Sequence, residues 1–429
     1  MRTPPPPPNL VLITLDTTRS DYLGYMGGGD HTPHIDALAA QSVRFVRATT
    51  VTNNTLPAHL SMLTGQHPAT IGVPRNGHAL AADVPVLAEQ LSAAGYQTAA
   101  FVSASALSRD LGIDRGFETF DQTFPVQEMD QRQRRAEATT DAALAWIEGA
   151  NEDKPFFLWV HYFDPHYPYT PPEEYLPKDG YRGPADGSLE YLLQVWGRAG
   201  RTQIETTVAD QAHMIGRYSG ELAYLDAQLG RLMAGVGAEP WVVLTADHGE
   251  SLTEHNYLFD HGEYLYQPSL AVPLLLRAPG VEPSDNTGQA QVIDVAPTFI
   301  AAAGLPLTQG IAGQDLNAAQ YDVDTIRAVA FAESCRPWTA EQPGQYANRL
   351  KAQSATAWPW KLIVTPFKQH VELYNLQQDP QELNNVVDEN PDVVAELAAA
   401  LEVWRSGSLR TGTPHFENME VLKALGYVE

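Results

Sequence analysis

The chain has 429 residues, of which 44% are hydrophobic and 18% charged, as is typical of a globular protein with a large core and a smaller second unit. Its net charge of −25 at pH 7 repels both a nucleic-acid backbone and an anionic lipid surface. We therefore exclude nucleic-acid-binding proteins and polybasic membrane anchors, and we expect an anionic substrate to need a local cation.

The first eight residues include five consecutive prolines and form the first predicted unit, a Pro-rich leader over 1–8. They lack the apolar core of a signal peptide, and no later stretch reaches the ~20 apolar residues of a membrane helix. As written, the chain is expected in the cytoplasm, whereas a trimmed export signal would place it in the periplasm. Cys335 is the only cysteine, so no internal disulfide can form.

Apolar and amphipathic segments alternate along the next three hundred or so residues. Residues 9–15 predict a strand buried on both faces, and a helix is predicted from Thr55 to Gly65 with Pro57 in its first turn. This alternation is typical of a doubly wound α/β domain, which we place at 9–330. The other predicted elements are helices over 34–41, 84–94 and 216–235 and strands over 43–48, 97–103, 156–161 and 241–246.

The pattern of the chain changes after residue 330. Residues 360–364 and 371–376 predict paired strands, and residues 392–405 predict a closing helix. We therefore expect a smaller α+β subdomain over 331–429. The fold class predicted for the whole chain is an α/β/α sandwich with a large, mostly parallel central sheet, followed by this subdomain.

Polar residues follow the ends of two predicted strands. Asp16 ends the first strand, and Asp247 and His248 follow the strand over 241–246. Taken singly, such residues are more often turn residues or helix caps, but the carboxyl ends of parallel strands meet at one edge of a sheet. Two carboxylates and an imidazole there suit a divalent cation, with zinc or manganese favoured and calcium open. Thr55 begins a helix, where free N–H groups favour an anion and a nearby cation activates a hydroxyl.

Taken together and in order, these motifs resemble the sulfatase family of the alkaline phosphatase superfamily. The residues that carry the resemblance are Asp16-Thr-Thr-Arg19, Thr55-Leu-Pro-Ala-His59, Met62-Leu-Thr-Gly65, Asp247-His-Gly-Glu250, Asp294-Val-Ala-Pro-Thr298 and Glu372-Leu-Tyr-Asn-Leu376. The resemblance runs from about residue 9 to the end. It implies an alkaline-phosphatase-like fold, an ester hydrolase, and one divalent metal ion whose ligands are Asp16, Thr55, Asp247 and His248.

The resemblance also implies contacts to the substrate. Asn76 lies where phosphonate monoester hydrolases of the superfamily carry an anion-binding asparagine, and His59 replaces the arginine of the nucleophile motif. His166 and His261 match histidines that touch the transferred group and the leaving-group side, so both are expected to act in catalysis and binding. Asp164 could join these two histidines in a second metal site, but its spacing favours a single metal.

The position of the nucleophile departs from the sulfatase pattern. Sulfatases oxidise a cysteine or serine to formylglycine where this chain has Thr55, and threonine oxidised at Cβ would give a ketone, which excludes formylglycine. Threonine resembles the nucleophile of phosphodiesterase branches of the superfamily. We therefore expect hydrolysis of a phosphodiester or phosphonate monoester, with phosphate monoesters open, through a covalent intermediate on Thr55.

Three alternatives remain at this point. They are hydrolysis of a sulfate ester without formylglycine, transfer of the group to an acceptor other than water, and a catalytically inert binding protein. The expected partner is a small anionic ester, with no nucleic acid and no membrane segment. Association into a homo-oligomer stays open.

Overall fold

The computed structural model describes residues 7–124, 133–319, 327–407 and 409–415, so most of the predicted leader lies outside the described residues. Its main sheet has eight strands in the order β5-β4-β6-β1-β7-β8-β2-β9. Only β8 runs antiparallel to its neighbours in this sheet. The strands are β1 (Leu10–Leu15), β2 (Val43–Thr49), β4 (Gln97–Phe101), β5 (Thr119–Asp121), β6 (Phe156–Tyr162), β7 (Trp241–Ala246), β8 (Leu274–Arg277) and β9 (Ser284–Gln291).

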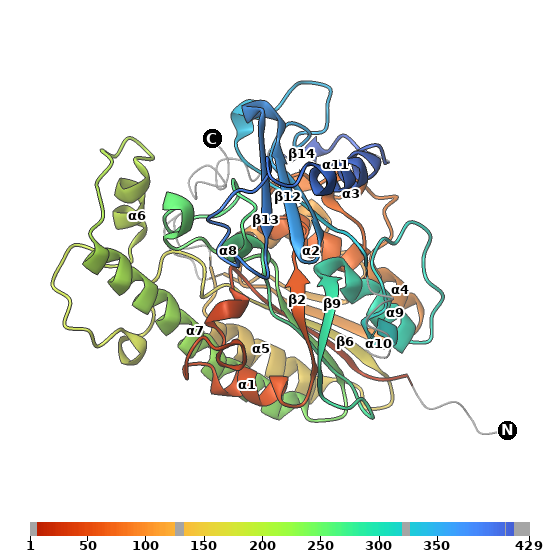
Figure 1. Ribbon diagram of the computed structural model, residues 1–429. Helices are drawn as coiled ribbons and strands as arrows, with labels where there is room; N and C mark the ends of the chain where they lie inside the picture. Colours follow the sequence, from red (N-terminus) through yellow and green to blue (C-terminus); the bar gives the residue numbers. More distant parts are fainter. Residues whose placement is uncertain (1–6, 125–132, 320–326, 408, 416–429) are drawn as a thin grey trace.

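Helices cover both faces of the main sheet (Figure 1). On one face α1 (Pro33–Ala39) and α5 (Ala136–Gly149) pack on the long helix α7 (Val208–Val236). On the other face α2 (Thr55–Thr64), α4 (Leu87–Ala93) and α9 (Val295–Ala302) contact one another. This confirms the predicted α/β/α sandwich. None of the helices in the described ranges combines the length and the apolarity needed to cross a membrane.

The centre of the sheet follows from the apolar runs in the sequence. Every residue of β1 is fully buried between β6 and β7, which is why the segment is apolar without alternation. Every residue of α2 is buried as well, so this helix has no polar face. Gly65 ends α2 in the left-handed conformation with φ of 67°, as expected for a glycine at a helix C-terminus.

Most predicted elements are present with bounds within three residues of the prediction. Helix α7 differs because it begins at Val208 rather than 216, since the Thr207 side chain and Asp210 cap each other's backbone N–H groups. Helix α5 was not predicted, because its buried positions are alanines and threonines rather than large apolar residues. Strand β8 was not predicted either, since its pairing with β2 and β7 joins distant parts of the chain.

The C-terminal part forms a four-stranded antiparallel sheet covered by one helix (Figure 1). The predicted strands pair directly as β12 and β13, and the predicted closing helix packs on the sheet through Leu397 and Leu401. Thus the predicted smaller α+β unit is present. Its elements are β10 (Ala330–Glu333), β11 (Gln353–Ala357), β12 (Trp360–Thr365), β13 (His370–Asn375) and α11 (Pro391–Arg405).

A buried ion pair joins the C-terminal sheet to the part of the chain that carries the main sheet. Lys361 on β12 and Glu382 are both buried, and Lys361 Nζ lies 2.6 Å from Glu382 Oε1. The other oxygen of this carboxylate accepts the backbone N–H of Gln267, the first residue of the short helix α8 (Gln267–Leu270), at 2.6 Å. The pair therefore fixes the sheet against a segment that also supports the candidate site described below.

This pair gives a test of how the two sheets are held together. We expect Lys361→Met to lower the free energy of unfolding by about 3 kcal/mol or more, because it leaves the Glu382 carboxylate buried without a cation. Urea denaturation followed by circular dichroism measures the change. Lys368→Met is the matched control, since its pair with Glu263 is partly exposed and should contribute about 1 kcal/mol or less.

The double variant Lys361→Met/Glu382→Gln removes both charges. It should recover part of the lost stability, because no buried charge then remains unpaired. Equal stability of Lys361→Met and Lys368→Met would contradict the proposed role of the buried pair.

Candidate active site and metal centre

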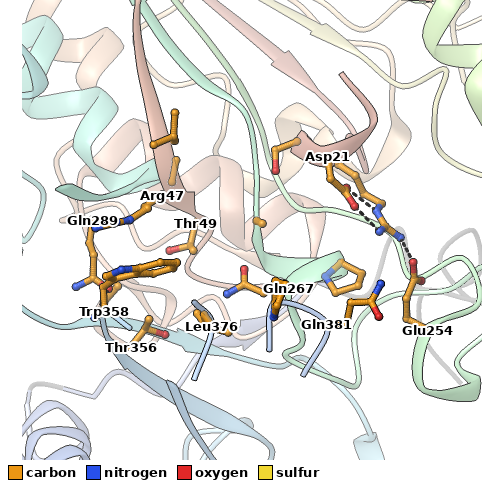
Figure 2. Close-up of a pocket in the computed structure, with 18 residues that line it drawn as sticks. Asp21, Arg47, Thr49, Glu254, Gln267, Gln289, Thr356, Trp358, Leu376 and Gln381 are labelled. Atoms are coloured by element: carbon orange, nitrogen blue, oxygen red, sulfur yellow. Dashed lines mark hydrogen bonds and ion pairs between the residues drawn. The ribbon is translucent and has the colours of Figure 1, made fainter. Parts of the chain in front are cut away.

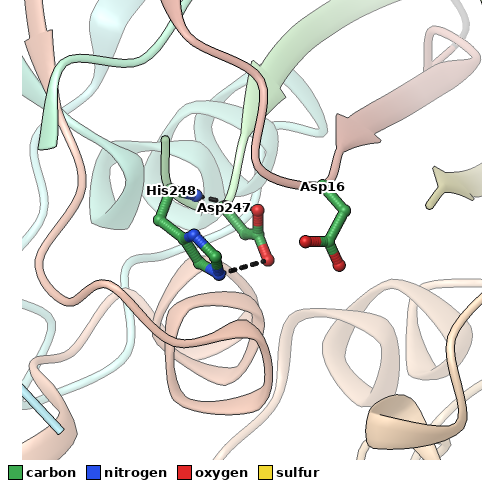
Figure 3. A group of neighbouring side chains, drawn as sticks. All are labelled: Asp16, Asp247 and His248. Carbon is green, nitrogen blue, oxygen red and sulfur yellow. Dashed lines mark hydrogen bonds and ion pairs between the residues drawn. The ribbon is translucent and has the colours of Figure 1, made fainter. Parts of the chain in front are cut away.

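Three potential metal ligands meet at the carboxyl ends of β1 and β7, which are neighbours in the sheet (Figure 3). One ligand atom from each of Asp16, Asp247 and His248 lies within 4.8 Å of the others, and all three residues are fully buried. Both oxygens of Asp16, Asp247 Oδ2 and His248 Nε2 have no hydrogen-bond partner among the described residues. Buried polar atoms are otherwise almost always paired, so this donor set fits a divalent cation.

The remaining atoms of these side chains are held by the backbone. Asp247 Oδ1 accepts the N–H groups of Thr17 and His248, at 3.2 and 2.8 Å. His248 Nδ1 lies 2.9 Å from the carbonyl oxygen of Gly249, which can only accept, so the neutral ring carries its proton on Nδ1. This leaves the lone pair of Nε2 facing the cluster, which is the form of histidine that binds a metal.

Burial also sets the electrostatics of the two carboxylates. Removal from water raises the pKa of Asp16 to about 7, although the nearby His248 opposes the shift. Burial raises the pKa of Asp247 too, and the charge of Asp16 adds to the effect. A divalent cation between the two carboxylates would offset both costs by supplying opposite charge.

Thr55 is the first residue of α2, and its hydroxyl is buried without a hydrogen-bond partner among the described residues. Asn76 is tied to the same helix end, because its backbone N–H donates to Asn54 Oδ1 at 2.7 Å and its Oδ1 accepts from Leu56 N at 2.8 Å. Asn76 Nδ2 remains buried and unpartnered within the described part of the chain. A hydroxyl, an amide N–H and a helix N-terminus thus lie together, as an anionic ester requires.

His59 is connected to Thr55 through the backbone of the same helix. Its Nδ1 lies 2.8 Å from Thr55 O and its Nε2 lies 3.0 Å from Thr14 Oγ1. Trp159 Nε1 donates to that same hydroxyl at 2.9 Å, so the Thr14 proton is directed at His59. Because both ring nitrogens have protein partners, these bonds favour a role in holding the first turn of α2 on β1 over the predicted contact with substrate.

His166 and His261 lie beside the cluster of three potential ligands. The ring centroid of His261 is 4.4 Å from that of His248 and 5.2 Å from that of His166. His261 Nδ1 lies 3.0 Å from Glu250 Oε1, and Tyr169 donates its hydroxyl to the other oxygen of that carboxylate at 3.1 Å. Burial lowers the pKa of both histidines, that of His166 to about 3, so both rings are neutral near pH 7.

His161 is a member of this cluster that was not predicted. It lies near the end of β6, beside β1, and its Nε2 is 3.4 Å from Asp16 Oδ2. Its Nδ1 accepts the backbone N–H of Ser103 at 3.3 Å, so the neutral ring carries its proton on Nε2, facing Asp16. The sequence does contain one sign of its role, since His161 is a titratable residue inside an otherwise apolar strand. That strand pairs with the strand that ends just before Asp16.

Asp164 is bound at the start of α5 and is not a member of the ligand cluster. Its Oδ1 accepts the backbone N–H of Ala136 at the start of α5, at 3.1 Å, and lies 3.8 Å from Arg135 Nη1. Arg135 also binds the buried Glu221 at 3.1 Å. Among the described residues, Asp16, Asp247 and His248 are the only group of three potential ligands close enough to share an ion. The second metal site that was left open with Asp164 is therefore not favoured.

Comparison with known proteins gives consistent family matches. The family model described as "Sulfatase" matches residues 8–305, and the model described as "N-sulphoglucosamine sulphohydrolase, C-terminal" matches residues 253–406. The chain is 24% identical to the uncharacterized sulfatase YidJ of Escherichia coli, over 89% of this chain and 83% of that protein. It is also 24% identical to a choline-sulfatase of Rhizobium meliloti, over 90% and 83%.

Solved structures share the fold at similar identity. A structure in complex with its substrate D-glucosamine-2-N,6-O-disulfate matches with a TM-score of 0.77 and 20% identity, over 96% of this chain and 99% of that one. The phosphonate monoester hydrolase of Silicibacter pomeroyi matches with a TM-score of 0.75 and 21% identity, over 96% and 100%. The same architecture thus carries proteins named for two ester classes.

The metal centre can be tested by metal analysis of purified protein. We expect about one equivalent of a divalent metal per chain, and we expect Asp247→Asn to lose it because one of three clustered ligands is removed. Asp226→Asn is the matched control. Asp226 is also buried, but it accepts the backbone N–H groups of His34 and Ile35 and is not one of the three clustered ligands. Equal metal content in the two variants would reject the ligand set.

Metal analysis also tests whether His161 orients a metal ligand rather than binding the metal itself. His161→Leu should keep the stoichiometry but weaken metal affinity by about 10- to 100-fold, the usual effect of losing a side chain that orients a ligand. Competition against a chromogenic chelator gives the affinity.

Proposed function

The chain belongs to the sulfatase family of ester hydrolases, and within this family we propose that it hydrolyses phosphate esters, with phosphodiesters and phosphonate monoesters preferred and Thr55 as the nucleophile. The observation that carries the proposal is the Thr55 hydroxyl. This hydroxyl is fully buried and has no hydrogen-bond partner among the described residues. Thr55 is also the first residue of the helix whose first turn His59 holds on β1.

We propose Asp16, Asp247, His248 and Thr55 as the ligands of one divalent cation, with zinc or manganese favoured by the mixed oxygen and nitrogen donors. Such an ion, when bound, supplies positive charge that activates the hydroxyl and polarises the ester. It would also account for the unpartnered buried atoms of these side chains.

The chain's own residues would then carry two displacement steps. In the first, Thr55 Oγ forms a bond to phosphorus and the bond to the leaving oxygen breaks, while the proton lost by the hydroxyl is balanced by a proton gained by the leaving oxygen. In the second, water attacks the phosphothreonine, releases the phosphate product and restores the hydroxyl. We assign to Asn76 Nδ2, which has no partner among the described residues, the donation of a hydrogen bond to a non-bridging oxygen as negative charge develops on it.

His261 and His166 are proposed to serve the leaving group. A leaving alkoxide needs a proton, and the ring of His261 lies 4.4 Å from that of His248 and 5.2 Å from that of His166. The 3.0 Å contact between Glu250 Oε1 and His261 Nδ1 fixes the orientation of that ring and gives a path along which its proton can be replaced. This contact makes His261 the better placed of the two.

Three observations bear on the ester class. A threonine cannot form the formylglycine with which sulfatases act, and this supports phosphorus over sulfur. Neighbours named phosphonate monoester hydrolase share the fold, which is compatible with the same preference. The relatives named choline-sulfatase and arylsulfatase K favour the second candidate, hydrolysis of a sulfate ester by an unmodified threonine.

Variants of Thr55 test the nucleophile. We expect Thr55→Ala to lower kcat by about 10³-fold or more, because it removes the attacking oxygen, and Thr55→Ser to keep part of the rate. Thr64→Ala is a control on the same helix, since its hydroxyl donates only to Leu60 O. Mass spectrometry of acid-quenched enzyme should find an added phosphoryl group on the peptide containing Thr55. An active alanine variant without any trapped intermediate would end the covalent proposal.

A panel of chromogenic esters tests the substrate class. We expect a phosphodiester or a phosphonate monoester with the same leaving group to give a higher kcat/KM than the sulfate monoester. A common leaving group is needed so that the rates compare only the transferred group. A sulfate monoester turned over faster than every phosphorus ester would favour the second candidate function instead.

A further inference from the structure

A cavity lies beside the loops that follow Asp16 and His248. It has a volume of about 340 Å³ and opens between β2, the turn after β1 and the C-terminal sheet (Figure 2). This volume is in the range of pockets that bind small molecules and suits a ligand of one or two rings. The residues that carry the argument below are Arg19, Arg47, Gln267, Thr356, Trp358 and Gln381, all of which line the cavity.

The cavity is separated from the metal ligands by backbone. Gly249 follows His248 directly, and its N–H donates to Ser269 O at 3.0 Å. A Cβ on Gly249 would lie only 2.0 Å from the carbonyl oxygen of Pro268, which lines the cavity. The two backbones are therefore in contact here, and none of the four proposed metal ligands lines the cavity. A ligand in the cavity would thus not be the ester that meets Thr55.

The wall of the cavity offers polar groups with no protein partner. The side-chain amides of Gln267 and Gln381 and the hydroxyl of Thr356 make no hydrogen bond to any described residue. Gln289, by contrast, is fully used, because it binds the carbonyls of Arg327 and Ala328 and the N–H of Trp358. The open amides and hydroxyl are thus available to a ligand, as in pockets built to bind one.

The two arginines of the wall differ in their charge partners. Arg19 is neutralised, since it binds Asp21 at 2.8 Å and Glu254 at 2.7 Å. Arg47 lies over the ring of Trp358, 4.1 Å from its centroid, and donates to Thr287 O at 2.8 Å. No carboxylate of the described residues lies within ion-pair distance of Arg47. One end of the cavity is therefore cationic and aromatic, and Figure 2 shows Gln267 and Gln381 between that end and Glu254.

We propose that this cavity is an accessory binding site for a small organic anion. Its acidic group would bind Arg47, its ring-sized apolar body would pack on Trp358 and Leu376, and further polar groups would bind the two free glutamine amides. The site goes beyond the proposed hydrolysis. Arg19 connects this cavity to the loop that carries Asp247 and His248, because Arg19 Nη1 also donates to the carbonyl oxygen of Glu250 at 3.2 Å.

The test uses benzoate and its neutral analogue benzamide as probes of the full chain by isothermal titration calorimetry. The two probes have nearly the same shape, and the protein's net charge of −25 opposes the anion everywhere except near a local cation. We expect benzoate to bind about tenfold more tightly than benzamide, from one charge-assisted contact to Arg47. Equal affinities, or no binding of benzoate, would overturn the proposal.

Substitutions of two arginines on β2 test whether benzoate binds at Arg47. Arg47→Gln should abolish the preference for benzoate and Arg47→Lys should keep part of it, while thermal melts check that both fold. Arg44→Gln is the matched control on β2, because Arg44 pairs with Asp285 at the surface and does not line the cavity. It should leave the preference unchanged. A loss as large in Arg44→Gln as in Arg47→Gln, or a preference that survives Arg47→Gln, would also overturn the proposal.

Discussion

The structure depends on two carboxylates that the protein buries without neutralising them. Asp16 and Asp247 lie at the ends of adjacent parallel strands, and no arginine or lysine of the described residues pairs with either. Burying unpaired charge is costly, so the surrounding fold must supply enough stability to hold this arrangement. It does so by placing the pair at the edge of a sheet whose central strand, Leu10–Leu15, is buried on both faces.

In three of the histidines around the cluster, the backbone group that faces one ring nitrogen determines which of the two nitrogens carries the proton. Where a histidine faces a backbone carbonyl, as His248 and His59 do, the proton lies on that side. Where it faces a backbone N–H, as His161 does, the proton lies on the opposite nitrogen and faces Asp16. The backbone thus determines that His248 presents a lone pair to the cluster, whereas His161 presents an N–H on the side of Asp16.

The sequence alone was sufficient to predict those structural features that are determined within a short segment of the chain. The strand before Asp16 and the helix from Thr55 could be predicted because burial and capping act within about ten residues. The role of His59 could not, because it depends on a bond to Thr14 on another element, and the same holds for His161 and Asp16. Side-chain pairs across a sheet leave no periodic trace in the chain, so only the structure brings them together.

The charge of the site also narrows the substrate within the proposed function. A divalent cation bound there would cancel the charge of the two carboxylates, and His59, His166 and His261 are neutral because burial lowers their pKa values. His59 stands where the family motif carries arginine, which removes a further positive charge from the site. A phosphate monoester is largely a dianion near neutral pH, whereas phosphodiesters and phosphonate monoesters are monoanions and need less positive charge. This charge balance supports the proposed preference for monoanionic phosphorus esters over phosphate monoesters. It does not distinguish them from the equally monoanionic sulfate esters, for which the proposal depends on the unmodified threonine.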